Sequence, residues 1–385
     1  MKRRGLLELA NAAPLLLMAR AAQASRDHSG LRASVGPPQA PHAMPGGDAQ
    51  RSRRAPSTLA AAPRVEQRLR IALGIGRGLV TRKDGSLFVL HPSARASSFD
   101  SQGKLLHSLK LPAEASGPPV VTSDGAVAFL AFGELLVVDE RGRIRSHTPL
   151  GETELSARSI LGARDGGLLL ATGSWLIKLS AFGELSFRKS IAETPLELLE
   201  TSVGPVCVTI SGSVQRLDAA GRLTKLGELG AATAAVTASA DATMLFARTG
   251  NHRLVSFDLD ERRLRASIED ATLELDGPVL LSRESTAQVF TSDGLLVRYR
   301  PDGSEAQRLP VDSGARKPPG PDDALLLSDG RLLLARAGAD AVLVTPTGEV
   351  STIASSACPD PIGLFAAGPR HVLLACRSGN LLVLA

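Results

Sequence analysis

Residues 123–149 read SDGAVAFLAFGELLVVDERGRIRSHTP and alternate short apolar runs with turns that contain glycine. The turns are Asp-Gly at 124–125, Gly-Glu at 133–134 and Arg-Gly at 141–142. Such dipeptides between Val-, Leu- and Phe-rich runs are typical of tight β-hairpins. The stretch therefore predicts an antiparallel meander of short strands.

Similar units recur about every 40 residues from residue 64 to residue 385. The turn between the first two strands of successive units falls near Gly85, Gly125, Gly166, Gly204, Ala242, Thr286, Gly330 and Arg370. Each unit has room for four short strands and shows no helical periodicity. The sequence therefore predicts an all-β fold, a β-propeller of about eight four-stranded blades. Seven blades are the alternative, if the degenerate eighth unit is shared with the first.

The two ends of the repeat region are expected to meet. The eighth unit ends at LLVLA, residues 381–385, which would be its third strand. Residues 65–73, VEQRLRIAL, precede the first unit and have alternating apolar positions. We expect this N-terminal strand to complete the last blade and close the ring, because an open blade would leave unpaired strand edges.

The first 63 residues differ from the repeats. Residues 1–24 begin with basic residues, continue with an apolar stretch and end in Ala-Gln-Ala, which predicts an export signal; Arg3-Arg4 resembles a twin-arginine signal. Residues 25–63 are rich in Pro, Ala, Ser and Arg without periodicity, which predicts a disordered linker before a propeller at 64–385. We expect a periplasmic or extracellular protein; a cytoplasmic protein with a basic tail is the alternative.

The net charge of +5 comes from the N-terminal segment. Residues 1–63 contain nine Lys or Arg and three Asp or Glu, so residues 64–385 carry −1. A nearly neutral body gives no reason to expect a nucleic-acid partner. No stretch reaches the roughly 18 uninterrupted apolar residues of a membrane-spanning helix, so none is expected.

No stretch of the sequence assembles a catalytic, cofactor or metal site. The Asp-Gly pairs are explained as turn residues, because Asp bonds its own backbone and Gly accepts a positive φ. The histidines lack zinc-ligand spacing, and there is no G-x-S-x-G nucleophile motif. Convergence of distant residues at the ring axis stays open at this point.

Two cysteines in the last unit form a candidate pair. A turn near residues 367–370 would fold the first two strands of that unit into a hairpin and bring Cys358 close to Cys376. An exported protein permits a disulfide between them, while the alternative is two unpaired buried thiols. Cys207 is expected to be a free, buried thiol.

The longest irregular insertion is VDSGARKPPGPDD, residues 311–323, between the sixth and seventh units. Loops on one face of a propeller commonly carry binding residues. Arg316, Lys317 and Asp322 are therefore candidates for a partner-binding loop, and a merely solvated loop is the alternative.

Three units share a pattern around their third strand: GELLVVDERG, GSVQRLDAAG and GLLVRYRPDG, ending at Gly142, Gly221 and Gly303. This pattern resembles the pyrroloquinoline-quinone-type propeller repeat, in which a Gly leads a strand ending in Leu-Asp before a Gly turn. The tryptophan that this family carries on the fourth strand is absent. The resemblance implies the propeller shape, which non-enzymatic envelope and assembly proteins share with dehydrogenases, and it implies no cofactor.

The sequence favours a non-enzymatic, monomeric propeller that binds a protein partner in the cell envelope. One alternative is a quinoprotein-like oxidoreductase, which needs an acidic base, calcium ligands and an aromatic floor for its flat cofactor. Trp175, the sole tryptophan, is expected to lie in the core instead. Another alternative is a hydrolase propeller with an axial metal, which needs Asp, Glu, Asn and His from several blades.

Overall fold

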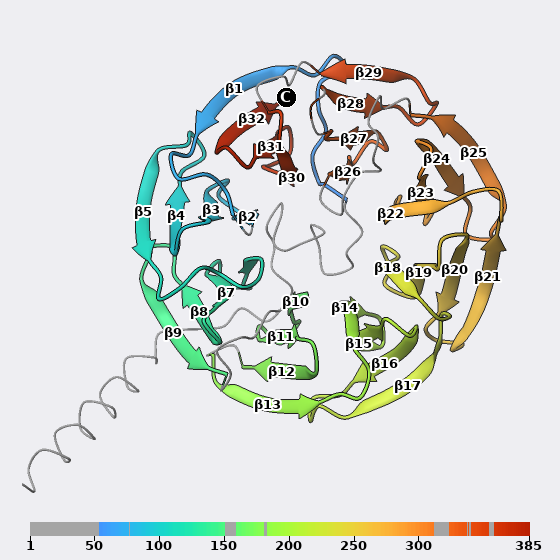
Figure 1. The fold of residues 1–385 in the computed structure, drawn as a ribbon, viewed down its shortest axis with the longest axis horizontal. Helices are drawn as coiled ribbons and strands as arrows, with labels where there is room; N and C mark the ends of the chain where they lie inside the picture. Colours follow the sequence, from blue (N-terminus) through green and yellow to red (C-terminus); the bar gives the residue numbers. More distant parts are fainter. Residues whose placement is uncertain are drawn as a thin grey trace, which may run out of the picture. The chain divides into compact units, whose positions relative to one another are not determined.

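The computed structural model describes residues 54–385 apart from 77, 151–158, 181–182, 312–322, 337, 339 and 354–357. In these residues the chain forms eight four-stranded antiparallel sheets arranged in a ring (Figure 1). The prediction of an all-β, eight-bladed propeller is therefore confirmed, and the alternative of seven blades is wrong.

Each blade runs from an innermost strand near the ring centre to an outermost strand at the rim (Figure 1). The innermost strands of blades 1 to 8 are β2 (Gly78–Thr81), β6 (Val120–Val121), β10 (Ser159–Gly162), β14 (Pro195–Thr201), β18 (Thr233–Ala238), β22 (Leu275–Leu281), β26 (Ala324–Leu326) and β30 (Pro361–Ala366). The second strands are β3 (Leu87–Leu90), β7 (Val127–Ala131), β11 (Leu168–Ala171), β15 (Gly204–Thr209), β19 (Met244–Thr249), β23 (Ala287–Thr291), β27 (Leu332–Leu334) and β31 (Val372–Cys376).

The outer half of each blade follows the same order. The third strands are β4 (Arg95–Phe99), β8 (Glu134–Val138), β12 (Trp175–Leu179), β16 (Ser213–Leu217), β20 (Arg253–Asp258), β24 (Leu295–Tyr299), β28 (Ala341–Val344) and β32 (Asn380–Leu384). The outermost strands are β5 (Leu105–Lys110), β9 (Ile144–Pro149), β13 (Leu185–Ser190), β17 (Leu223–Glu228), β21 (Arg263–Glu269), β25 (Glu305–Pro310), β29 (Val350–Ile353) and, in blade 8, β1 (Val65–Arg70).

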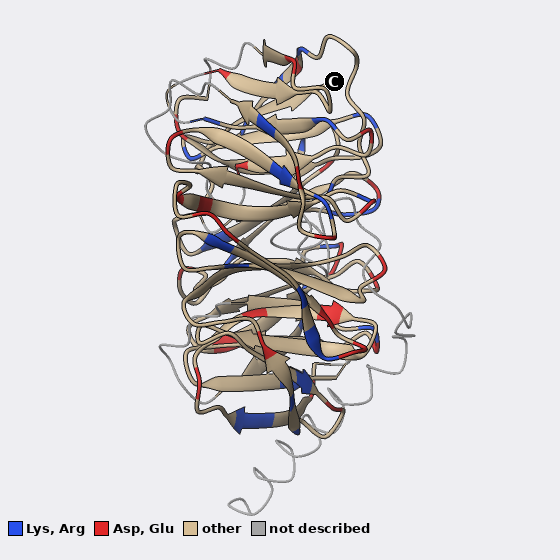
Figure 2. Cartoon of the chain, turned by 90° about the vertical axis from the view of Figure 1, so that its right-hand side faces the viewer, with Lys and Arg blue, Asp and Glu red and all other residues tan. Residues whose placement is uncertain are grey.

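The burial of each strand follows its place in the blade. All five residues of β7 are buried, because its two faces pack on the neighbouring blades, whereas β9 at the rim contains no buried residue. The core between blades is therefore built from Val, Leu, Ile and Ala on consecutive positions. At the rim, acidic and basic residues are interspersed (Figure 2).

The ring closes as expected. The N-terminal strand β1 pairs antiparallel with β32, with Val65 opposite Leu384 and Leu69 opposite Leu381. Blade 8 therefore contains both ends of the repeat region, and backbone hydrogen bonds between them remove the open sheet edge.

The C-terminal end of the expected linker is ordered and packed in the structure. Residues 54–60, which we call the strap, run along blades 7 and 8, and Ala55, Ser57 and Leu59 are buried. Ala55 and Leu59 belong to the apolar core between these blades. The composition gave no sign of this order, because the strap is held through its backbone and two small apolar contacts rather than through a periodic apolar face.

A glycine in the turn between the third and outermost strands lets adjacent blades approach closely. Gly142 has a φ of 74°, and a Cβ there would lie 2.6 Å from the Cβ of His107 on the outermost strand of the preceding blade. A Cβ at Gly221 would lie 2.9 Å from the ring of Phe187 in the same way. The glycine therefore serves both the turn conformation and the contact between blades.

Blade 5 lacks this glycine and makes room differently. Its turn carries Arg262 with a φ of 56°, and the glycine lies instead on the preceding outermost strand, at Gly227. A Cβ at Gly227 would lie 2.5 Å from the ring of Phe257 in blade 5. Blades 4 and 5 therefore still approach closely, but here the glycine lies on the outermost strand of blade 4 and not in the turn of blade 5.

We expect Gly142→Ala to destabilise the protein more than Gly250→Ala. Both glycines have a positive φ, 74° and 61°, so both substitutions share a backbone cost of about 1–2 kcal/mol. Nothing lies within 4 Å of a Cβ at Gly250, whereas His107 must move in the Gly142 variant, which adds about 1–3 kcal/mol. Urea denaturation measures the difference, and equal losses for the two variants would contradict the contact.

Candidate binding cleft on the turn face

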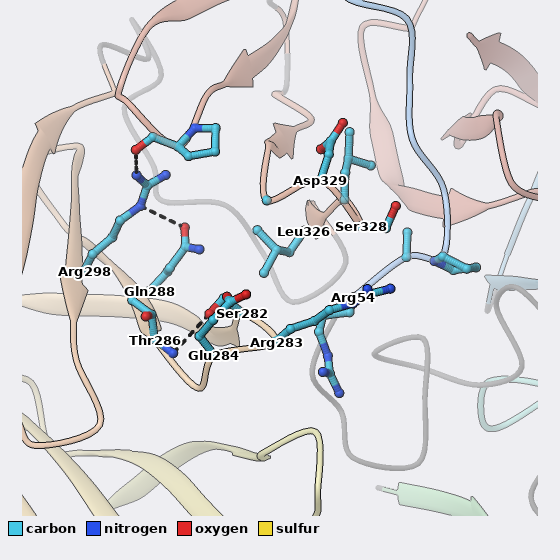
Figure 3. Close-up of a pocket in the computed structure, with 15 residues that line it drawn as sticks. Arg54, Ser282, Arg283, Glu284, Thr286, Gln288, Arg298, Leu326, Ser328 and Asp329 are labelled. Carbon is cyan, nitrogen blue, oxygen red and sulfur yellow. Dashed lines mark hydrogen bonds between the residues drawn. The ribbon is translucent and has the colours of Figure 1, made fainter.

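A cleft of about 500 Å³ lies between blades 6 and 7. It opens on what we call the turn face, the side of the ring that carries the turns between first and second strands and those between third and outermost strands. Residues 282–286 of blade 6 and 327–330 of blade 7 form two of its walls, and strap residues 54–56 form another (Figure 3). The cleft is therefore lined by turns, whose backbone groups are only partly used within the blades.

The strap reaches the cleft because it pairs with the innermost strand of blade 7. Arg54 forms a parallel β-bridge with Leu326 of β26, and the Ala55 N–H donates to the Leu326 carbonyl at 2.8 Å. From there the strap follows the seam between blades 7 and 8, where the Thr58 N–H donates to the Pro369 carbonyl at 2.8 Å.

Most of the polar contacts of the strap use its backbone. The Ser57 carbonyl accepts from the Ser328 N–H at 3.0 Å and from the Ser328 hydroxyl at 3.1 Å. The Arg331 guanidinium donates to the carbonyls of Leu59 and Ala60. The Ser57 hydroxyl adds a bond to the Gly368 carbonyl. The turn face therefore binds an extended chain with little dependence on its side chains.

The cleft between blades 6 and 7 has a corresponding backbone donor. The first turns correspond by their hydrogen bonds, Ser282 N to Thr286 O in blade 6 and Leu327 N to Arg331 O in blade 7. By this equivalence Arg283 corresponds to Ser328, which binds the strap. Within the residues that the structure describes, the Arg283 N–H has no hydrogen-bond acceptor. It is available to an incoming chain.

Arg298 lines this cleft from the third strand of blade 6 and is 6% exposed. Its guanidinium donates to the side-chain oxygen of Gln288 and to the carbonyl of Pro346 in blade 7 (Figure 3). It also donates to the side-chain oxygen of Gln307 and to the carbonyl of Thr345. Burial lowers the pKa of the Arg298 guanidinium, which still stays charged near neutral pH. The side chain therefore joins blade 6 to blade 7 and places a cation in the cleft.

His91 and Ser97 form a pair that resembles a nucleophile and its base. The Ser97 hydroxyl lies 2.9 Å from Nε2 of His91, and Nδ1 lies 2.7 Å from the Gly74 carbonyl, which assigns the ring proton to Nδ1. His91 and Ser97 are only 2% and 4% exposed, and burial lowers the pKa of His91. We interpret the pair as structural, because it fastens the chain between β1 and β2 to blade 1.

Of the candidate site residues singled out in the sequence, those that the structure describes do not line this cleft. Arg316, Lys317 and Asp322 of the candidate partner-binding loop lie outside the described residues. Trp175 is half-buried against the core, with the Arg188 guanidinium 4.2 Å from its ring centroid. The sequence pattern revealed neither the strap nor Arg298, since neither belongs to a motif.

The described residues contain no group of three or more His, Cys, Asp or Glu that could hold a metal ion. In the same part of the chain, no helix has the length and apolar character needed to cross a membrane.

Cys358 and Cys376 are joined by a disulfide, with their Cα atoms 5.4 Å apart. Cys376 ends β31, and Cys358 lies in the connection that leads into β30, so the bond fastens this connection to blade 8. Cys207 is free and buried, and burial raises the pKa of its thiol to about 12.

We expect the unreduced protein, once unfolded in guanidinium chloride, to show a single reactive thiol, that of Cys207. Reduction should raise the count to three, because Cys358 and Cys376 are then released. The Cys207→Ser variant is the control and should show none before reduction. Three thiols in the unreduced protein would contradict the disulfide.

Comparison with known proteins supports the fold. No protein-family model matches the sequence, and no curated protein matches it. Among solved structures, the computationally designed Ika8 protein matches with a TM-score of 0.65 and 11% identity, over 82% of this chain and 98% of its own. BamB from Moraxella catarrhalis matches with a TM-score of 0.65 and 14% identity, over 84% and 98%. Virginiamycin B lyase from Staphylococcus aureus matches with a TM-score of 0.52 and 12% identity, over 83% and 98%.

These likenesses show the fold and define the class of protein, a β-propeller. The matched structures include a design and a lyase, so the shared fold does not determine what this chain does.

Proposed function

We propose that this protein is a non-enzymatic β-propeller that binds a protein partner in the cell envelope, through the cleft between blades 6 and 7. The observation that supports the proposal is the strap, which occupies the neighbouring seam of the same face as an extended chain. The strap adds to the innermost strand of blade 7 through backbone bonds, which is a common way for folded domains to bind peptides. A segment of a partner would bind the open cleft in the same manner.

Two features of the chain support the proposed location in the cell envelope. Residues 1–24 have the pattern of an export signal, and the bond between Cys358 and Cys376 is of a kind that persists in oxidising compartments. We further propose that the repeats are of the pyrroloquinoline-quinone type, on the shared pattern that ends at Gly142, Gly221 and Gly303. We propose a monomer, because β1 closes the ring within one chain. We also propose that the protein needs no cofactor, and that it binds no nucleic acid because residues 64–385 carry a charge of only −1.

Cross-linking from the cleft tests the partner site. A photo-reactive amino acid replaces Glu284, which is exposed beside the cleft, and in a matched control it replaces Phe132, which is 53% exposed on the opposite face. Both variants are expressed in the protein's own cells, and native mass spectrometry determines the composition of the gently purified protein.

We expect one partner at a fixed ratio. It should be cross-linked from position 284 through a continuous segment of the partner's chain, and it should not be cross-linked from position 132. Cross-links from position 132 alone would contradict the site. A bare monomer without cross-links at either position would contradict partner binding.

A further inference from the structure

Within the residues that the structure describes, Arg298 is a buried cation without a counter-ion. All its hydrogen-bond acceptors are neutral, namely the amide oxygens of Gln288 and Gln307 and the carbonyls of Thr345 and Pro346. Among the described residues no carboxylate lies within ion-pair distance of it. A buried charge without a partner of opposite sign is costly, so such a group is often paired by a ligand.

Two of the other arginines that join blades have an acidic partner. The Arg164 guanidinium lies 3.2 Å from the Glu200 carboxylate across blades 3 and 4. Arg248, across blades 5 and 6, lies 3.7 Å from the Asp276 carboxylate. Arg298 differs from both in lacking an anion, and it also differs in lining a cleft.

The guanidinium of Arg298 keeps a donor for a ligand. It has five N–H groups, and four of them have an acceptor in the structure. Nη2 carries two N–H groups and donates to one acceptor, the Thr345 carbonyl at 3.3 Å. The remaining Nη2 N–H is therefore open to a further acceptor. Figure 3 shows the guanidinium at one side of the cleft, across from Leu326 and Asp329.

The charge of the lining suits an anionic group. The lining contains Arg54, Arg283 and Arg298 together with Glu284 and Asp329, and the Asp329 carboxylate is paired with Arg331 at 2.7 Å. Because Arg331 compensates Asp329, the lining has an excess of positive charge that attracts a carboxylate.

We propose that the cleft binds an extended partner segment that carries a carboxylate, and that this carboxylate pairs with Arg298. The inference rests on the proposed function and specifies the chemistry of the partner. The backbone of the segment would bond the turns as the strap does, and the carboxylate would supply the anion that Arg298 lacks. An acidic side chain and a C-terminal carboxylate share this chemistry.

Matched synthetic peptides test the proposal on the full chain. Extended peptides of unrelated sequence are made in pairs that differ only in Glu against Gln, and in a second set of pairs that differ only in a free against an amidated C-terminus. Binding is measured by fluorescence anisotropy. We expect the carboxylate member to bind about tenfold more tightly, and the set that shows the preference identifies the source of the carboxylate.

Two variants assign the effect to a residue. Arg298→Gln should abolish the preference for the carboxylate, whereas Arg248→Gln, which also removes an arginine between blades, should retain it. Thermal unfolding of each variant verifies that the ring is intact.

The outcomes separate this inference from the proposed function. Peptides that bind without a preference for the carboxylate, or a preference that survives in Arg298→Gln or disappears in Arg248→Gln, would overturn the inference and leave peptide binding intact. Failure of every peptide to bind the full chain, together with the absence of cross-links from the cleft, would contradict both.

Discussion

The ring depends on how closely one blade can approach the next. A turn glycine such as Gly142 is pressed against the outermost strand of the preceding blade, at His107, and Gly227 takes over this role where blade 5 carries Arg262. With an aromatic content of 3%, the chain has few large rings to fill the space between blades. Arginines help to join adjacent blades instead, because they donate hydrogen bonds to carbonyls of the next blade. Arg82, for example, donates to the Gly125 carbonyl at 3.0 Å.

Closing the ring also brings the strap onto the turn face. Because β1 completes blade 8, the residues just before it must cross that blade, and they follow the seam to β26. Their contacts show which backbone groups of the turns can hold an extended chain. The adjacent cleft has a corresponding donor in the Arg283 N–H and, in Arg298, a buried cation without an anion among the described residues. Closure, the strap and the proposed partner site are thus parts of one arrangement.

Features that repeat or alternate could be predicted from the sequence, and features that depend on a single distant contact could not. The recurring glycine turns predicted the blades, and the alternation of apolar and polar residues in residues 65–73 predicted the closing strand. The strap could not be foreseen, because backbone bonds hold it and leave no periodic pattern. Arg298 occupies an ordinary strand position, and its guanidinium donates to the Pro346 carbonyl, 48 residues away, which no local pattern reveals.

Amide hydrogen exchange of the strap tests the central claim most directly, because the proposed partner segment would bind through backbone bonds like those of the strap. The N–H groups of Ala55 and Thr58 donate to carbonyls of blades 7 and 8. The account predicts that both exchange at least about a hundredfold more slowly than in an unstructured peptide. Exchange of both amides at the unstructured rate would show that the strap does not occupy the seam, and would remove the structural basis for a peptide site on the turn face.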